Sequence, residues 1–385
     1  VDQLALWPDD QQPTHLIACN EAGAGQPGVL RIALADGRVE TILSGTTSCD
    51  PVRRTPWGTL VFAEEAGGGP AGGRVYELLD PLHTTGVRLD RNTGTFSGGE
   101  GATNLVARPA LGRLSFEGIA IFRNGLMYVS DERGPDEGGA GGAYFKFIPA
   151  NPWTSNATGT ISSLNDSPLV SGRLYGLRVG TGGPAAESGQ GAGYGPGTWV
   201  PIPGVVDPDL PAQATTLELS GYYRPEDADV DLAASARGQV RFCGSHSGNE
   251  AQLQRWGEVA CISDGSVEEA MRNAGQPQVE VFVAGTSELN MPDNIAYQPV
   301  RGNWIVHEDG DTQFQQPHNN DLWSCLPDGR DVDVRSDGCI RVATLNDLTA
   351  EWTGGIFDGS GKHFYVSVQH NISGSGTVLD ISGWE

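Results

Sequence analysis

Acidic, histidine or amide side chains end six apolar runs of this chain. The runs are LIACNEA, LVFAEEA, LMYVSDE, VRFCGSH, WIVHEDG and FYVSVQH, and their last residues include Glu21, Glu64 with Glu65, Asp131 with Glu132, His246, Glu308 with Asp309, and Gln369 with His370. The same polarity at six strand ends indicates that those ends meet in one place. Gathered carboxylate oxygens are the ligands that hard cations such as Ca2+ prefer. The sequence therefore predicts a calcium site where the six ends converge.

A β-propeller has the strands that could bring these ends together, because its inner strands surround a shared axis. After most of the runs comes a turn rich in Gly, Pro and Asp, and then a strand that carries aromatic residues, such as VYEL (75–78) or DLWSC (321–325). Strand, turn and strand at a repeating distance are typical of propeller blades. We therefore expect an all-β fold, a six-bladed β-propeller whose innermost strands are the six runs. The whole chain, residues 1–385, would form this single domain.

Residues 150–220 lengthen one of the steps between the runs. This segment is rich in Gly, Pro, Ser and Thr, and its part 180–197 has low complexity. Strand patterns lie on both sides of that part, which argues against a linker between domains. We interpret the segment as an irregular insert, one blade with a long loop over one face. The best helix pattern elsewhere is 266–275, with a capping box from Ser266 to Glu269.

The charge balance excludes some classes of partner. There are 48 acidic and 24 basic residues, a formal net charge of -24. Nucleic acid and anionic membrane surfaces bind to basic faces, so neither is expected as a partner, whereas bound cations suit an acidic chain. No apolar run reaches the roughly 18 residues that a membrane span needs. The chain opens at Val1 with no signal peptide, which we interpret as a mature, processed N-terminus.

The six cysteines predict an oxidising compartment, the periplasm or the cell exterior. Cys325 and Cys339 flank a polar turn and are expected to form one disulfide. Cys243 and Cys261 lie on what could be neighbouring strands and are expected to form another. The spacing C-x-x-C does not occur, which argues against a zinc knuckle.

An ordered series of short strings resembles the PhoX-type alkaline phosphatases, a family of secreted bacterial enzymes. The strings are Cys49 with TPWGT (55–59) and Glu64-Glu65, GRLSFE (112–117), YVSDER (128–133) with YFKF (144–147), RPE (224–226), MPDNIA (291–296), GNWI (302–305) with EDG (308–310), and WTGGIF (352–357) with YVSVQH (365–370). The resemblance runs from about Cys49 to His370 and leaves the long insert unmatched. It implies a six-bladed propeller with calcium and iron on its axis that cleaves phosphomonoesters.

The resemblance also implies roles for single residues. Cys49 falls on the family's iron-ligating cysteine, and Arg224 falls on its phosphate-contacting arginine. Other matched positions fall on its metal ligands or near its site: Glu64, Glu65, Glu117, Glu226, Asp293, Asn294 and Asp309. The implied cofactors are Ca2+ and Fe3+.

The chain departs from the family pattern at three points. Asp50-Pro51-Val52 follows the cysteine where the family usually has Ala-Gly-Gly, and Phe116 stands where a histidine is expected. Cys19 is an additional thiol. A bridge between Cys19 and Cys49 would remove the iron ligand.

The residues themselves leave alternatives open. Adjacent side chains of a regular strand point to opposite faces, so Glu64 and Glu65 can serve one site only at a strand end or a bulge. Otherwise they are solvated glutamates on a surface strand. Arg224 could be a structural ion-pair partner of Glu226 instead of a phosphate ligand, and His370 is expected to be a core or surface histidine.

Three functions follow from this pattern. The first is a secreted metal-dependent phosphomonoesterase acting on a phosphorylated small molecule, which axial Ca2+, Fe3+ on Cys49, and Arg224 would hold. The second is a calcium-stabilised propeller without catalysis that serves as an extracellular binding or assembly module. The third is a calcium-dependent lactonase or esterase. A free thiolate at Cys49 favours the first, and a disulfide between Cys19 and Cys49 favours the other two.

Overall fold

Strands far outnumber helices in the structure, a computed structural model that describes residues 1–134, 141–154, 159–180, 193–204, 206–248, 256–310, 318–329 and 331–384. Within these ranges the helices are short: α1 (Leu210–Thr216), α2 (Leu232–Ala236) and α3 (Val267–Met271), with the 3-10 helices η1 (Ala102–Asn104), η2 (Pro109–Leu111), η4 (Leu164–Asp166) and η5 (Pro168–Val170). None of the helices in these ranges is long and apolar enough to cross a bilayer.

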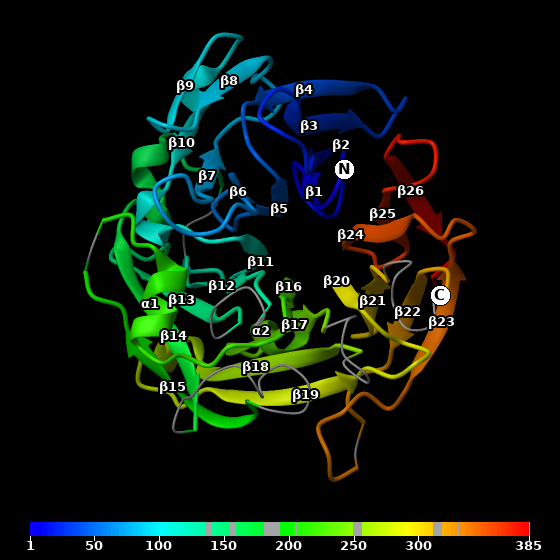
Figure 1. Ribbon diagram of the computed structural model, residues 1–385. Coiled ribbons are helices and arrows are strands. Elements are labelled where there is room, and N and C mark those ends of the chain that lie inside the picture. The colour runs from blue at the N-terminus through cyan, green and yellow to red at the C-terminus, as the bar shows by residue number, and fades with distance from the viewer. Residues whose placement is uncertain are drawn as a thin grey trace.

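Six inner strands form a closed ring. They are β1 (Leu4–Trp7), β5 (Cys49–Arg54), β11 (Phe116–Ile121), β16 (Pro225–Val230), β20 (Pro292–Tyr297) and β24 (Glu351–Phe357). Each lies at the edge of its sheet and contacts the next around the ring, and β24 contacts β1 to close it. Figure 1 shows these strands facing the centre of the molecule, with the other strands radiating outward. The prediction of an all-β propeller is therefore confirmed.

The six apolar runs form the second strand of each group, so the prediction that they are innermost was wrong. These strands are β2 (His15–Cys19), β6 (Leu60–Glu64), β12 (Met127–Asp131), β17 (Gln239–His246), β21 (Trp304–Glu308) and β25 (His363–Gln369). Each pairs antiparallel with the inner strand before it. The second strands give a clear sequence signal because both of their faces are buried, as in β6, β12 and β21, so their apolar runs are nearly unbroken.

The inner strands have a weaker signal because a β-bulge interrupts them. In β5, β11, β16 and β20 the register shifts directly after the first residue of the strand. A bulge re-aims side chains and breaks the two-residue period. The second residue of each of these strands is acidic: Asp50, Glu117, Glu226 and Asp293.

Outer strands complete five sheets. They are β3 (Pro27–Ala33), β4 (Val39–Ser44), β7 (Val75–Leu78), β8 (Val87–Asp90), β9 (Thr95–Ser97), β10 (Leu105–Ala107), β13 (Tyr144–Pro149), β14 (Gly172–Val179), β15 (Gly195–Pro201), β18 (Glu258–Ser266), β19 (Gln278–Ala284), β22 (Asp321–Cys325), β23 (Cys339–Thr344) and β26 (Thr377–Ser382). β15 pairs with β19 and so joins β11–β15 and β16–β19 in one nine-stranded sheet. The described strands therefore do not form six separate sheets.

The predicted insert contains ordinary sheet as well as irregular chain. β14 pairs with β13 in continuous register, and β15 pairs with β14. Residues 181–192 of the low-complexity part lie outside the described residues. At α3 the predicted capping box is present, because Ser266 Oγ accepts the Glu269 N–H and the Glu269 carboxylate accepts the Ser266 N–H. The helix ends at Met271, earlier than the pattern suggested.

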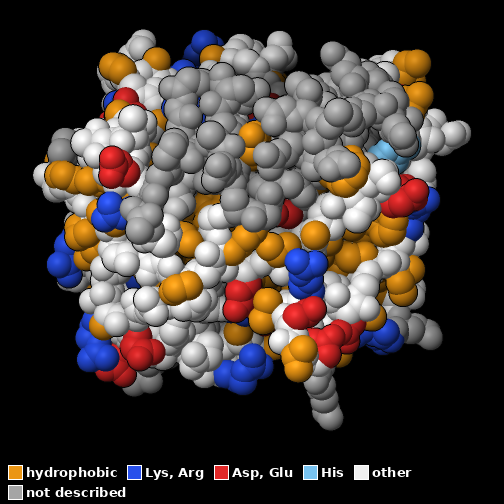
Figure 2. All heavy atoms as spheres, turned by 60° about the horizontal axis from the view of Figure 1, so that its bottom comes forward, with side chains coloured by type: hydrophobic (Ala, Val, Ile, Leu, Met, Phe, Trp, Pro, Cys, Tyr) orange, Lys and Arg blue, Asp and Glu red, His pale blue; other side chains and the backbone are white. Residues whose placement is uncertain are grey.

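All six cysteines are paired. The two predicted disulfides are confirmed, since Cys243–Cys261 joins β17 to β18 and Cys325–Cys339 joins β22 to β23. The third, Cys19–Cys49, joins the end of β2 to the start of β5 and so connects two sheets. Figure 2 turns the β18–β19 side of the molecule forward, and there acidic and basic side chains are interspersed with hydrophobic ones.

Candidate metal centre

A polar cleft of about 200 Å³ lies at one end of the ring of inner strands. Four of its lining residues are the bulge acids Asp50, Glu117, Glu226 and Asp293. A second set follows the second strands by one or two residues: Glu21, Glu65, Glu132, Asp309 and His370. The remaining lining residues are Asp2, Arg224, Glu351, Thr353 and Gln369. Most of the lining therefore comes from two recurring positions: the second residue of an inner strand, and the one or two residues that follow a second strand.

Six of the nine residues named for the site line this cleft: Arg224, Glu65, Glu117, Glu226, Asp293 and Asp309. Glu64, Cys49 and Asn294 do not line it. The family resemblance gave no role to Asp2, Glu21, Asp50, Glu132 or Glu351, although Glu21 and Glu132 lie at strand ends that were predicted to converge. Asp50 could have been found, because it occupies the same second-residue position as Glu117, Glu226 and Asp293. Asp2 and Glu351 had no comparable signal.

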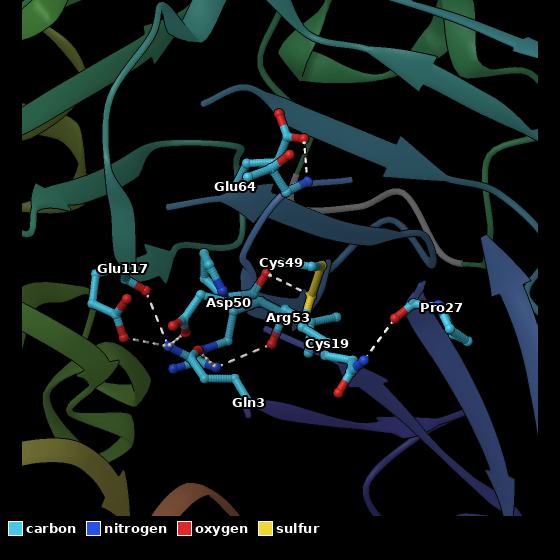
Figure 3. The surroundings of a disulfide bond; sticks show 12 residues. Gln3, Cys19, Pro27, Cys49, Asp50, Arg53, Glu64 and Glu117 are labelled. Carbon is cyan, nitrogen blue, oxygen red and sulfur yellow. Dashed lines mark hydrogen bonds between the residues drawn. A yellow bond between two sulfur atoms is a disulfide. The ribbon is translucent and has the colours of Figure 1, made fainter. Parts of the chain in front are cut away.

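The carboxylate of Glu64 is buried inside the sheet. It accepts hydrogen bonds from the Thr47 N–H at 2.9 Å and the Tyr76 hydroxyl at 3.0 Å, and Arg91 Nε lies 2.7 Å from it. Figure 3 shows Glu64 well apart from Asp50 and Glu117. Assigning Glu64 to the metal set is therefore corrected: it anchors the loop that leads into β5. The side chains of Glu64 and Glu65 diverge, as alternation along a strand requires.

Cys49 is not a free thiol, because its sulfur is bonded to Cys19. Both cysteines are fully buried, and Figure 3 shows the disulfide beside Asp50. The implied role of Cys49 as an iron-ligating thiolate is therefore corrected. The next residue, Asp50, lines the cleft, whereas Cys49 does not. At this point of the chain the cleft is therefore offered a carboxylate oxygen and no sulfur.

Three overlapping groups of carboxylates have ligand oxygens within 4.8 Å of one another. They are Asp2, Glu21 and Asp50; Asp50, Glu65 and Glu117; and Glu117, Glu226 and Asp293. Asp50 and Glu117 each belong to two groups, so the three form one continuous cluster. A fourth group, Glu308 with His318 and Asp321, lies outside the lining of the cleft.

Burial and mutual repulsion shift the titration of these carboxyls. Burial, and after it the neighbouring Glu132, raise the pKa of Glu65 to about 11. Burial raises the pKa of Glu226 to about 8, although Arg224 opposes the shift. Burial first, and then neighbouring carboxylates, raise the pKa of Asp50, Glu117 and Asp293 well above the usual range. Such a cluster is stable only when protons or cations neutralise it.

The cleft fits hard cations. Ten carboxyl groups line it, and Arg224 is the one arginine among the described lining residues. The ligand atoms of the three groups are all carboxylate oxygens. This donor set suits Ca2+, Mg2+ or Mn2+. It does not suit iron held by a thiolate, since the one cysteine in the right place is in a disulfide.

Arg224 lies directly before β16 with its backbone in the left-handed region, at φ 52°. Its Nε donates to Glu132 Oε1 at 2.5 Å, and its Nη2 lies 3.4 Å from Glu226 Oε1. The side chain keeps 35% of its surface exposed. A guanidinium has five N–H groups, so these two carboxylates hold its plane in place and leave donors for another anion.

Gln3, the residue directly before β1, holds members of the cluster in place through its side-chain amide. Its side-chain amide donates to Asp50 Oδ1 at 3.2 Å and to the Glu117 carbonyl at 3.1 Å, and it accepts from Arg53 at 2.6 Å. Arg53 also forms a salt bridge with Asp227 at 2.5 Å. Figure 3 shows Gln3 reaching between Asp50 and Glu117. These contacts fix the positions of carboxylates that would otherwise repel one another.

Comparison with known proteins gives one family match. The family model described as alkaline phosphatase PhoX matches residues 28–371. A search of curated proteins gave no match. Among solved structures, a glucose dehydrogenase shares 11% identity at a TM-score of 0.50, with 100% of this chain and 96% of that chain covered. The PQQ-bound aldose sugar dehydrogenase from Streptomyces coelicolor shares 12% identity at a TM-score of 0.46, with 99% and 93% covered. At these identities the likeness concerns the fold alone.

Proposed function

The chain belongs to the alkaline phosphatase PhoX family, and from this premise we propose that it is a calcium-dependent phosphomonoesterase. The observation that carries the proposal is the cleft, whose described lining holds ten carboxyl groups and one arginine. Its substrate would be a phosphorylated small molecule.

In this proposal the cations bind to Asp50, Glu65 and Glu117 and to Glu226 and Asp293, with Asp309 nearby. When bound, they supply Lewis acidity that neutralises the charge of the phosphoryl oxygens. No serine nucleophile is required. Iron has no part in this proposal, because Cys49 offers no thiolate.

Arg224 orients the phosphoryl group. Its contacts with Glu132 and Glu226 are made before substrate arrives, so the free N–H groups are preorganised toward the cleft. Preorganised donors stabilise the charge that develops on the equatorial oxygens during phosphoryl transfer. Ser247 keeps Glu226 in position by donating to its carboxylate at 2.6 Å.

We further propose that the six inner strands define six blades and that β15 only bridges two of them. The support is that each inner strand begins a new antiparallel group with its own second strand. We also propose that the protein works in the periplasm or outside the cell, because three disulfides persist only in an oxidising compartment.

A second candidate is a calcium-stabilised propeller without catalysis. Two observations favour it: Cys49 is in a disulfide, and Arg224 already has two carboxylate partners. A calcium-dependent lactonase or esterase shares the same carboxylate ligands.

One experiment separates these candidates. The calcium-loaded protein is assayed on p-nitrophenyl phosphate, a simple lactone and an aryl acetate, together with Arg224→Ala and the control Arg173→Ala, which changes an exposed arginine on β14. We expect hydrolysis of the phosphate ester, a loss of about 100-fold in kcat/KM for Arg224→Ala, and no change for Arg173→Ala. Full activity with a lowered Tm in Arg224→Ala would make Arg224 a structural ion-pair partner.

A further inference from the structure

Asp2, Glu21 and Asp50 come from three separate strand ends and meet at the side of the cleft next to β1. One ligand oxygen of each lies within 4.8 Å of the others. Asp2 and Glu21 precede residues 28–371, the part of the chain that the family model matches. Asp50 is one of the departures from the family pattern. Neither the family match nor the predicted site assigns a role to this group.

The Cys19–Cys49 disulfide holds the members of this group close together. Glu21 follows Cys19 by two residues, and Asp50 is the residue after Cys49. The disulfide therefore ties together the two strands that present these carboxylates. Asp2 is held beside the same disulfide, because its N–H donates to the Cys19 carbonyl at 2.9 Å. The bond that removes a thiolate from the cleft thus also gathers three carboxylates.

Asp2 gives an independent sign of a missing ligand. Its side chain lines the cleft and is only 4% exposed, yet its Oδ1 has no hydrogen-bond partner among the described residues. Leaving a buried polar atom unpaired is costly unless another group binds it. The other oxygen, Oδ2, accepts from the Gln369 amide at 3.0 Å, and the same amide donates to Glu21 Oε2 at 3.2 Å. Gln369 therefore positions two of the carboxylates and leaves Asp2 Oδ1 unpaired.

We propose that Asp2, Glu21 and Asp50 hold a divalent hard cation, with Ca2+ as the preferred ion. All three ligands are carboxylate oxygens, which Ca2+ binds in flexible geometry together with water. Glu21 is exposed, so the ion has a path from solvent and room for water ligands. This site adds one cation to the cluster of the proposed function, but it does not depend on phosphatase activity.

The test counts bound calcium. Four proteins are dialysed against the same series of free Ca2+ concentrations and analysed for metal content. They are the full chain, Glu21→Gln, Asp2→Asn and the control Glu100→Gln, which changes an exposed carboxylate after β9. Circular dichroism verifies that each variant is folded. We expect Glu21→Gln and Asp2→Asn each to bind one Ca2+ fewer than the wild type, and Glu100→Gln to equal the wild type.

Equal calcium content in all four proteins at every concentration would overturn the proposal. Because Glu21 is exposed, its variant is expected to fold even where Asp2→Asn does not, so the comparison stays decisive. The readout is metal content, so this inference can fail while p-nitrophenyl phosphate is still hydrolysed, and it can hold when no hydrolysis is found.

Discussion

Glu64 and Glu65 are adjacent in the chain, but their carboxylates serve different parts of the molecule. Glu64 is buried in the sheet with Arg91 Nε 2.7 Å away, whereas Glu65 lines the cleft near Glu132. Glu64 stabilises the strands and the loop that surround the cleft, and Glu65 adds a carboxyl group to the lining of the cleft. This division recurs at Glu308 and Asp309, since Glu308 accepts the Asn290 N–H at 3.0 Å and Asp309 lines the cleft.

We predict that Glu64→Gln and Glu65→Gln have opposite effects on the metal-free protein. Glu64→Gln removes a charged partner of Arg91 and should lower the free energy of unfolding by about 1–3 kcal/mol, without changing calcium binding. Burial keeps the Glu65 carboxyl protonated in the metal-free folded state, and taking up that proton at neutral pH costs free energy. Glu65→Gln removes this cost and should raise Tm in chelator. It also removes a carboxylate ligand and should weaken calcium binding. Urea unfolding and melting curves in chelator, together with calcium titration of both variants, test this pair. Equal calcium affinities would place Glu65 outside the metal set.

The metal-free protein should lose stability as the pH rises from about 5 to about 8. The pKa of Glu226 is raised from its usual value to about 8, so the folded state holds a proton that the unfolded state has released in this window. When the folded state binds more protons, the free energy of unfolding falls with increasing pH. Melting curves in chelator at several pH values give the slope. A Tm in chelator that is constant or rises over this window would contradict the repulsion described for the cleft.

Removing calcium should lower Tm substantially near pH 8. A ligand that binds only the folded state stabilises it by about 2.7 kcal/mol at a concentration of 100 times its Kd, and the cleft has several groups that can bind. Loss of calcium also exposes the repulsion among Asp50, Glu117 and Asp293. Superimposable melting curves with calcium and with chelator would mean that the cleft holds no cation of importance for folding.

Chemical analysis should find no free thiol and no stoichiometric iron. All six cysteines are paired, so a thiol reagent should label none of them in the denatured, unreduced protein and all six after reduction. Without a thiolate at Cys49, iron should be far below one atom per chain. One reactive thiol at Cys49 together with one iron per chain would restore the iron site that the resemblance implies.

The sequence predicted the part of the site that follows regular strands. The second strands carry nearly unbroken apolar runs, so the positions of Glu65, Glu132 and Asp309 at their ends could be expected. The inner strands could not be recognised in the same way, because a bulge after residues such as Cys49 breaks the alternation. This is why the runs were placed innermost.

Contacts between residues that are distant in the sequence could not be predicted from the order of apolar and polar residues. Asp2 lies directly before β1, whose contact with β24 closes the ring, and it is held there by Cys19 and Gln369, which are distant in sequence. The Cys19–Cys49 disulfide depends on how two neighbouring sheets pack, so the sequence left it open. The side-chain direction of Glu64 followed from strand alternation, but family resemblance had assigned it to the metal set.

Calcium reconstitution of the iron-free protein tests the central claim most directly. Protein freed of metal with chelator is titrated with CaCl2 in iron-free buffer, and the initial rate of p-nitrophenyl phosphate hydrolysis is measured alongside Tm. The account predicts that the rate and Tm rise together with Ca2+ alone, without added iron. A Tm that rises with Ca2+ while no phosphate ester is hydrolysed at any calcium concentration would contradict a calcium-dependent phosphatase and leave a calcium-stabilised propeller without catalysis.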